Sequence, residues 1–280
     1  MNYRLLALDL DGTLLDDNLQ IRRDSIEAIN RVRAQGVQVM LVTGRHHVTA
    51  YPYWHELGLS LPAICCNGVY VYDFQQQRPL AKNPMTRPEA RALLALVRQF
   101  DMHSMIYVDD AVAYETEGTH PPFISTWAET LPVHLRPRLD RVDSFERLIE
   151  EAPTLWKFTT ASDDTQRIEA FVDEIERTLG LACELSGAFR LDIARAGNSK
   201  GARLAEWIAE QGIKKEEVIA FGDQYNDLEM LRLAGVGIAM ENGVAKLRAC
   251  ADWVTGRNNS DGIAQALNRF IPASAELGHG

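Results

Sequence analysis

The sequence predicts an α/β fold in which an open, mostly parallel sheet is interrupted by an inserted α+β region. Three observations carry this prediction. Apolar, strand-like runs alternate with helical patterns near both ends of the 280-residue chain. Between them, strands and helices follow one another at hairpin-like spacing. A polar stretch with two prolines, residues 83–88, precedes the change and is typical of a boundary.

The first region alternates strand and helix. Continuous apolar runs at residues 5–8 and 37–42 predict two strands buried on both faces. Apolar residues at helical spacing predict a helix over residues 23–35, which a glycine ends. An Asn-Gly turn after a strand at residues 63–66 predicts a hairpin with residues 69–72.

The middle region mixes helices with short strands, which predicts a small α+β unit. Its predicted elements are a helix at 89–100, strands at 104–108 and 112–115, an irregular proline-containing segment at 120–138, a strand at 155–160, a helix at 165–179 and two further short strands.

The alternating pattern then returns. The predicted elements are helices at 200–211, 227–234, 243–251 and 261–270, with strands at 218–221 and 237–240. We expect a loose tail over residues 274–280. Ligands of open α/β sheets bind outside the carboxyl ends of the strands, so polar motifs that follow the strands should converge on one rim.

Composition narrows the function classes. A formal net charge of −10 argues against a nucleic-acid surface for the chain as a whole and leaves open only a local basic groove. No apolar run is long enough to cross a bilayer, and we expect no signal peptide. The four cysteines lack metal-ligand spacing, so we expect reduced thiols in a cytoplasmic protein.

The run Asp9-Leu10-Asp11-Gly12-Thr13 directly follows the first predicted strand. Two carboxylates two residues apart on an extended segment point to the same face. A carboxylate can attack phosphorus and carry the phosphoryl group as an aspartyl-phosphate. The ordinary alternative is a strand that ends in an Asp/Gly turn.

Three further elements follow in order. Thr43 ends the second strand run, and its hydroxyl and neighbouring amides can hold phosphate oxygens. Lys200 lies in the first turn of a helix and would offset charge on a phosphate. Asp223, Asn226 and Asp227 follow the strand at 218–221. Several carboxylates beside one lysine would repel one another and any phosphate. A hard divalent cation would relieve this repulsion, and oxygen ligands suit Mg2+.

Each of these elements also has an ordinary structural explanation. Thr43 and Gly44 can form a strand-to-loop turn, Ser199 can cap a helix with Lys200 solvated, and the carboxylates at 223–227 can complement a helix dipole. Together these explanations require independent coincidences, in order, at the same ends of predicted elements. We therefore favour the functional interpretation.

This ordered series resembles the haloacid dehalogenase superfamily of phosphohydrolases. The position of the insert, together with Gly197-Asn198-Ser199-Lys200-Gly201, is similar to the Cof-type branch (subfamily IIB) with the larger α/β cap. The resemblance covers essentially the whole chain. It implies a Rossmann-like catalytic core at residues 1–84 and 190–280 and a mobile, specificity-determining cap at 85–189.

The resemblance also implies residue roles in an Mg2+-dependent phosphatase that acts through an aspartyl-phosphate. Asp9 would be the nucleophile and a metal ligand. Asp11 would be the general acid and then the base, with its backbone carbonyl on the metal. Asp223 would ligate Mg2+, and Asp227 would support Asp223 without itself binding the metal. The residues that would bind phosphate or substrate are Leu10, Thr43, Gly44, Lys200 and Asn226.

For the leaving group, residues 43–48, 64–68, 107–110 and 156–158 are similar to bacterial pyridoxal phosphate phosphatases of this branch. A flat pyridine ring favours an aromatic wall, and its protonated nitrogen favours a carboxylate. The candidates are Tyr107, Tyr114, Trp127, Trp156 and Phe158 for the wall and Asp109 or Asp110 for the nitrogen. The alternatives are cap core for the aromatics and a hairpin turn for the two acids.

His46 and His47 are adjacent, so they rarely aim at one site, and a magnesium site does not favour imidazole. We expect one of them near a pocket mouth and the other solvated or capping a helix.

Two other functions stay open at this point. One is a sugar-phosphate or broad-specificity metabolite phosphatase on the same core. The other is a phospho-ligand-binding module without turnover, against which the presence of Asp9, Asp11, Lys200 and Asp223 argues. In each case the expected partner is a small phosphorylated metabolite, with no nucleic acid and no membrane, and the oligomeric state is not predicted.

Overall fold

The computed structural model describes residues 2–116, 122–187 and 189–273. It forms two compact units. Unit 1 comprises residues 1–42, 59–61 and 204–280, and unit 2 comprises residues 43–58 and 62–203. The tail at 274–280, which we expected to be loose, lies outside the described residues.

Unit 1 contains a five-stranded sheet in the order β14-β13-β12-β1-β2, and every pairing in it is parallel. Its strands are β1 (Leu5–Leu8), β2 (Gln38–Leu41), β12 (Val218–Gly222), β13 (Val236–Met240) and β14 (Trp253–Thr255). Strands β1, β12 and β13 are buried along their whole length, which explains their continuous apolar sequences. The predicted α/β class is confirmed.

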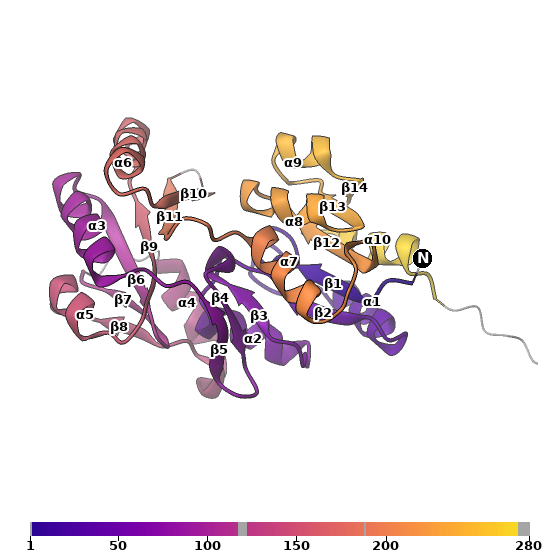
Figure 1. The fold of residues 1–280 in the computed structure, drawn as a ribbon. Coiled ribbons are helices and arrows are strands. Elements are labelled where there is room, and N and C mark those ends of the chain that lie inside the picture. Colours follow the sequence, from indigo (N-terminus) through magenta and orange to yellow (C-terminus); the bar gives the residue numbers. More distant parts are fainter. Residues whose placement is uncertain (1, 117–121, 188, 274–280) are drawn as a thin grey trace, which may run out of the picture. The chain divides into compact units, whose positions relative to one another are not determined.

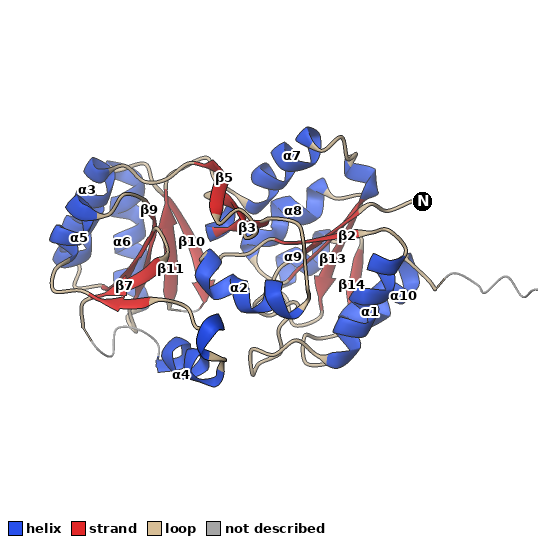
Figure 2. Ribbon diagram, turned by 90° about the horizontal axis from the view of Figure 1, so that it is seen from below, coloured by secondary structure: helices blue, strands red, loops and turns tan. Residues whose placement is uncertain are grey.

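Helices cover both faces of this sheet (Figures 1 and 2). The chain passes from β1 to β2 in one direction across the sheet and from β12 to β13 in the other. Right-handed crossovers therefore put α1 and α8 on opposite faces. The helices are α1 (Arg23–Ala34), α8 (Leu228–Leu233), α9 (Ala245–Cys250) and α10 (Gly262–Phe270), with 3-10 turns η3 (Lys215–Glu217) and η4 (Tyr225–Asp227). Helix α7 (Lys200–Glu210) begins in unit 2 and runs into unit 1.

Unit 2 contains a six-stranded sheet in the order β10-β11-β9-β6-β7-β8. Its strands are β6 (His103–Val108), β7 (Ala111–Tyr114), β8 (Leu139–Arg141), β9 (Leu155–Ala161), β10 (Ala182–Gly187) and β11 (Arg190–Ala194). Figure 2 shows α3 (Arg87–Gln99), α5 (Phe145–Glu151) and α6 (Thr165–Thr178) against one face. Phe158, Phe171 and Ile106 are fully buried in the core between them.

Unit 2 also contains a three-stranded sheet, β3 (Ala63–Cys65), β4 (Tyr70–Asp73) and β5 (Arg78–Lys82), together with α2 (His47–Glu56). The predicted hairpin is confirmed, because β3 and β4 pair antiparallel around the turn η1 (Cys66–Gly68). Asn67 and Gly68 adopt φ of 56° and 89° there.

The segment at 120–138 was predicted to be irregular, and this was wrong at residues 122–130 and 133–135. Helix α4 (Pro122–Thr130) and the 3-10 turn η2 (Val133–Leu135) lie there, whereas residues 120–121 fall outside the described ranges. A proline at the start of a helix breaks no helical hydrogen bond, so Pro122 begins the element rather than preventing it. Elements α2, α5, β5, β8 and β14 were not predicted.

The extent of unit 2 differs from the predicted insert at 85–189. It also includes residues 43–58, 62–84 and 190–203, and β11 pairs with β9 and β10. Compactness does not define which part carries catalysis and which part moves. The division into a catalytic core and a mobile cap therefore stays a prediction.

No helix among the described residues is both long enough and apolar enough to span a bilayer. All four cysteines are free, and Cys65 and Cys66 are buried.

Candidate active site

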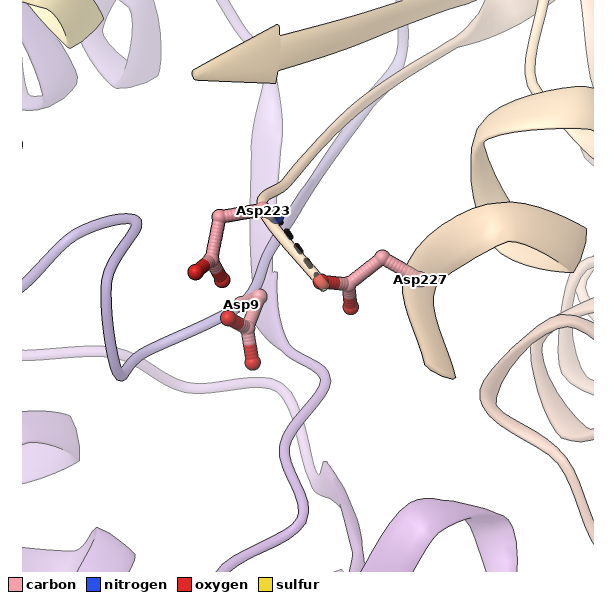
Figure 3. A group of neighbouring side chains, drawn as sticks. All are labelled: Asp9, Asp223 and Asp227. Atoms are coloured by element: carbon pink, nitrogen blue, oxygen red, sulfur yellow. Dashed lines mark hydrogen bonds between the residues drawn. The ribbon is translucent and has the colours of Figure 1, made fainter. Parts of the chain in front are cut away.

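Three carboxylates from two segments of unit 1 meet beyond the carboxyl ends of β1 and β12, with Asp9 following β1 and Asp223 and Asp227 following β12. Asp9, Asp223 and Asp227 are buried, and each offers an oxygen that lies within 4.8 Å of the others. Figure 3 shows these three side chains gathered in one place. The pairing of β1 with β12 sets Leu8 beside Phe221, so the chain brings the residues that follow into the same neighbourhood.

Hydrogen bonds fix the orientation of these carboxylates. Asp223 Oδ1 accepts from the Thr13 hydroxyl at 3.2 Å, and Asp223 Oδ2 accepts from Gln224 Nε2 at 3.3 Å. Asp227 Oδ2 accepts from the backbone N–H of Asp223 at 2.9 Å (Figure 3). The same oxygen also accepts from the backbone N–H of Gln224 at 3.0 Å. One oxygen of Asp227 thus holds the loop that carries Asp223.

Two glycines make room for the acids. Gly12 has a φ of +75°, and a Cβ there would overlap the Asp223 carboxylate. A Cβ on Gly222 would overlap Asp227. Asn242 Nδ2 donates to the Gly12 carbonyl at 2.8 Å and holds this turn, a contact that sequence reasoning missed because Asn242 belongs to no recognisable motif.

The expectation that Asp9 and Asp11 lie on an extended segment was wrong. Strand β1 ends at Leu8, and the chain then turns, with Leu14 N donating to Asp9 O at 3.3 Å. The Asp11 side chain is exposed and is not one of the three grouped carboxylates. Its proposed role as an acid and base stays a prediction.

The donor set fits a hard divalent cation. It consists of buried carboxylate oxygens, without imidazole or thiolate, and Mg2+ favours oxygen ligands. Three buried carboxylates this close repel one another, and a bound cation would relieve that repulsion. The predicted Mg2+ is compatible with the site.

Thr43 and Lys200, the predicted phosphate ligands, belong to unit 2. Thr43 is buried, its N–H donates to Ile64 O at 2.9 Å, and its Oγ1 accepts from Arg45 N at 3.0 Å. Ser199 Oγ accepts from Ala202 N at 2.9 Å and so caps α7. Lys200, however, is only 1% exposed, so the alternative of a solvated surface lysine was wrong.

The adjacent histidines are both buried, so neither is solvated. His46 Nδ1 accepts from Val48 N at 3.2 Å, so His46 caps α2, as one alternative predicted, and its Nε2 lies 2.9 Å from Val108 O. His47 lines a pocket of about 400 Å3 together with Tyr72 and Arg138. Burial lowers the pKa of His46 well below its usual value and that of His47 to about 3.

The residues predicted to bind the pyridine ring are aromatic candidates for its wall and two acids for its nitrogen. Phe158 packs in the apolar core behind the sheet, as the alternative interpretation predicted. Asp109 and Asp110 form the turn between β6 and β7, where Asp109 O accepts from Trp156 Nε1 at 3.1 Å and Asp110 Oδ1 lies 2.9 Å from His47 Nε2. A role for either acid at a pyridine nitrogen stays a prediction.

Comparison with protein families gives one match over most of the chain. A family model described as haloacid dehalogenase-like hydrolase matches residues 6–267. The pyridoxal phosphate phosphatase YbhA of Escherichia coli is 43% identical over 267 residues, which are 95% of this chain and 98% of that protein. The 5-amino-6-(5-phospho-D-ribitylamino)uracil phosphatase YitU of Bacillus subtilis is 27% identical, covering 95% of this chain and 97% of that protein.

Solved structures show the same architecture. A haloacid dehalogenase-like hydrolase from Bacteroides thetaiotaomicron aligns with a TM-score of 0.83 and 25% identity, covering 96% of this chain and 99% of that one. The protein TM0651 from Thermotoga maritima aligns with a TM-score of 0.79 and 26% identity, covering 95% and 97%.

Proposed function

The chain belongs to the haloacid dehalogenase-like hydrolases and is a phosphoric monoester hydrolase, and we propose that it works through a phosphorylated Asp9. The observation that carries this proposal is the buried group formed by Asp9, Asp223 and Asp227. Its support is that Asp9 is held beside two other carboxylates at the rim where an α/β sheet binds ligands, and a carboxylate there can act as a nucleophile.

Two displacements then complete the reaction. In the first, an Asp9 oxygen bonds to phosphorus while the bond from phosphorus to the ester oxygen breaks, and Asp11 donates a proton to the departing alkoxide. In the second, Asp11 takes a proton from water as the water oxygen bonds to phosphorus. The acyl-phosphate bond breaks, which releases inorganic phosphate and restores Asp9.

Other groups would bind the phosphoryl oxygens and balance their charge. Thr43, Gly44, Asn226 and the Leu10 backbone would hold phosphoryl oxygens, and the Lys200 ammonium would offset their charge. Asp9, the Asp11 carbonyl and Asp223 would hold Mg2+, with Asp227 fixing the Asp223 loop. When bound, the cation supplies positive charge to the equatorial oxygens.

We propose pyridoxal 5'-phosphate as the substrate. The support is the 43% identity to a relative named for that activity, over 95% of this chain. A sugar phosphate or a broader set of metabolite phosphates is the second candidate, because a 27% identical relative is named for a ribityl-phosphate substrate. A cytoplasmic location completes the proposal, supported by the four free cysteines.

A substrate panel separates these candidates. Phosphate release with Mg2+ is measured for pyridoxal 5'-phosphate, a phosphoribityl compound and hexose phosphates. A kcat/KM for pyridoxal 5'-phosphate about tenfold or more above the others supports the first candidate. Comparable values across the panel would instead support the broader activity.

A further inference from the structure

A buried ammonium in unit 2 stands directly behind the loop that carries Thr43. Lys157, on β9, is 2% exposed. Its Nζ lies 2.8 Å from Asp192 Oδ2 on β11 and donates to the Gly44 carbonyl at 2.9 Å. The same Nζ lies 4.6 Å from the centre of the Tyr107 ring. Burying a lysine is costly unless it is well paired, so each of these contacts matters for where the ammonium sits.

One peptide group links the hydrogen bond that Lys157 donates to Gly44 with a hydrogen bond to Thr43. The Gly44 carbonyl that accepts from Lys157 shares its peptide plane with the N–H of Arg45. That N–H donates to Thr43 Oγ1 at 3.0 Å. Because the Thr43 oxygen already accepts one hydrogen bond, its own hydrogen is the group left to donate. A charge-assisted bond at one end of a peptide also strengthens the bond at its other end.

The acid that holds Lys157 is itself held in place. Asp192 Oδ1 accepts from the Thr159 hydroxyl at 2.8 Å, and its Oδ2 accepts from Asn67 Nδ2 at 3.4 Å. Asn67 also closes the space beside Gly44, where a Cβ would lie 2.8 Å from Asn67 Oδ1. The ion pair and the loop therefore share a supporting residue.

We propose that Lys157, held by Asp192, is a positioning residue that orients the Thr43 hydroxyl as a hydrogen-bond donor through the Gly44–Arg45 peptide. This inference rests on the proposed phosphate-binding role of Thr43. Burial is the largest influence on the pKa of Lys157 and lowers it, but Asp192, Tyr107 and Cys66 together outweigh burial, and the net shift of the pKa is upward. The ammonium therefore stays charged near neutral pH.

A double-mutant cycle tests the relay. Hydrolysis of p-nitrophenyl phosphate with Mg2+ is measured for Lys157→Met, Thr43→Val and the double variant. We expect kcat/KM to fall about tenfold for Lys157→Met and about 10- to 100-fold for Thr43→Val. The double variant should match Thr43→Val within about threefold, because Lys157 acts only through the hydroxyl. In a Thr43→Ser background, which keeps a hydroxyl, Lys157→Met should still cost about tenfold.

Two further variants separate positioning from stability. Lys157→Met leaves Asp192 buried without its cation, which can prevent folding. The double variant Lys157→Met/Asp192→Asn removes both charges and replaces the single variant in the test if the single variant does not fold. Arg91→Met breaks an ion pair with Glu150 in the same unit that is about half exposed, and it should leave kcat/KM unchanged.

If the fold losses in kcat/KM of Lys157→Met and Thr43→Val multiply in the double variant, Lys157 does not act through the Thr43 hydroxyl. That result would overturn the relay while leaving the role of Thr43 intact. An unchanged kcat/KM for Thr43→Val would instead contradict the proposed function at Thr43, and with it the premise of the relay.

Discussion

Gly12 and Gly36 both have a backbone conformation that favours glycine, but they differ in what a side chain would meet. Both have positive φ, +75° and +90°, yet a Cβ at Gly12 overlaps the Asp223 carboxylate while one at Gly36 meets nothing within 4 Å. Each alanine variant should lose about 1–3 kcal/mol of stability from the backbone. Only Gly12→Ala should also lower kcat/KM, by about 100-fold, because it displaces Asp223. Urea unfolding and steady-state kinetics on both variants check this, and equal activity in the two would refute the crowding argument.

His47 makes stability depend on pH. Its pKa is about 3 in the folded chain, below the ordinary value near 6.5, because burial disfavours the charged ring. Below about pH 6.5 the unfolded chain therefore binds a proton that the folded chain does not. Stability from this residue is complete above about pH 6.5 and falls with acidification, by roughly 3 kcal/mol at about pH 4.5.

The measurement is the free energy of unfolding at neutral pH and at about pH 4.5, for the wild type and for His47→Gln. The acid-induced loss should be smaller in the variant, since Gln does not titrate. The same loss in both would show that another group carries the effect.

Residue-level prediction succeeded where chemistry and position coincide. Asp9 and Asp223 could be brought together from the sequence, because each follows an apolar run that becomes a neighbouring parallel strand. Lys157 and Asp192 could not be paired in advance, because nothing local indicates that a strand lysine faces inward. The segment from Asp9 to Asp11 was wrongly predicted as extended, because strand β1 stops at the residue before Asp9.

At the scale of elements, the turn η1 sets the start of α7. Gly68 has a φ of +89°, and a Cβ there would overlap the Ser199 carbonyl, one residue before Lys200. Arg203 Nε donates to Gly68 O at 2.9 Å and ties the helix to the turn. Gly68→Ala should therefore shift the beginning of α7 and lower kcat/KM at least about tenfold.

The matched control is Gly180→Ala, which has a similar φ of +62° with nothing within 4 Å. It should lose comparable stability while keeping its activity. Kinetics on the two purified variants, with thermal unfolding as the stability measure, decide the point. A fully active Gly68→Ala enzyme would show that the turn does not position α7.

The elements that were not predicted have weak periodicity or exposed edges. Helix α2 contains Pro52 and has apolar residues all round, so it lacks a clear helical stripe. Strand β5 lies at a sheet edge, and none of its residues is fully buried. Helix α5 could have been found, since Ser144 caps it and Phe145, Leu148 and Ile149 have helical spacing.

At the scale of the whole molecule, the acidic group should couple metal binding to stability. A ligand that binds only the folded chain stabilises it by about 2.7 kcal/mol at a concentration 100 times its Kd. Mg2+ should therefore raise the Tm of chelator-treated protein and restore activity that EDTA removes. Asp223→Asn should lose both responses. If EDTA changed neither the activity nor the Tm, a cation at this site would be ruled out.

The fold class was predictable because strand and helix patterns alternate along the sequence, and the parallel five-stranded sheet of unit 1 confirms it. The extent of the second unit was not, because its compactness depends on long-range packing of residues 43–58 and 62–84. Exchanging residues 85–189 with those of a relative should move the substrate preference, and an unchanged preference would show that this region does not select the substrate.

The most direct test of the central claim is to trap the phosphorylated enzyme. Asp11→Asn protein, mixed with p-nitrophenyl phosphate and Mg2+, is quenched in acid within the first turnover and mapped by peptide mass spectrometry. The account predicts one added phosphoryl group, located on Asp9, that Asp9→Asn abolishes together with turnover. A phosphoryl group on another residue, or normal turnover by Asp9→Asn, would contradict it.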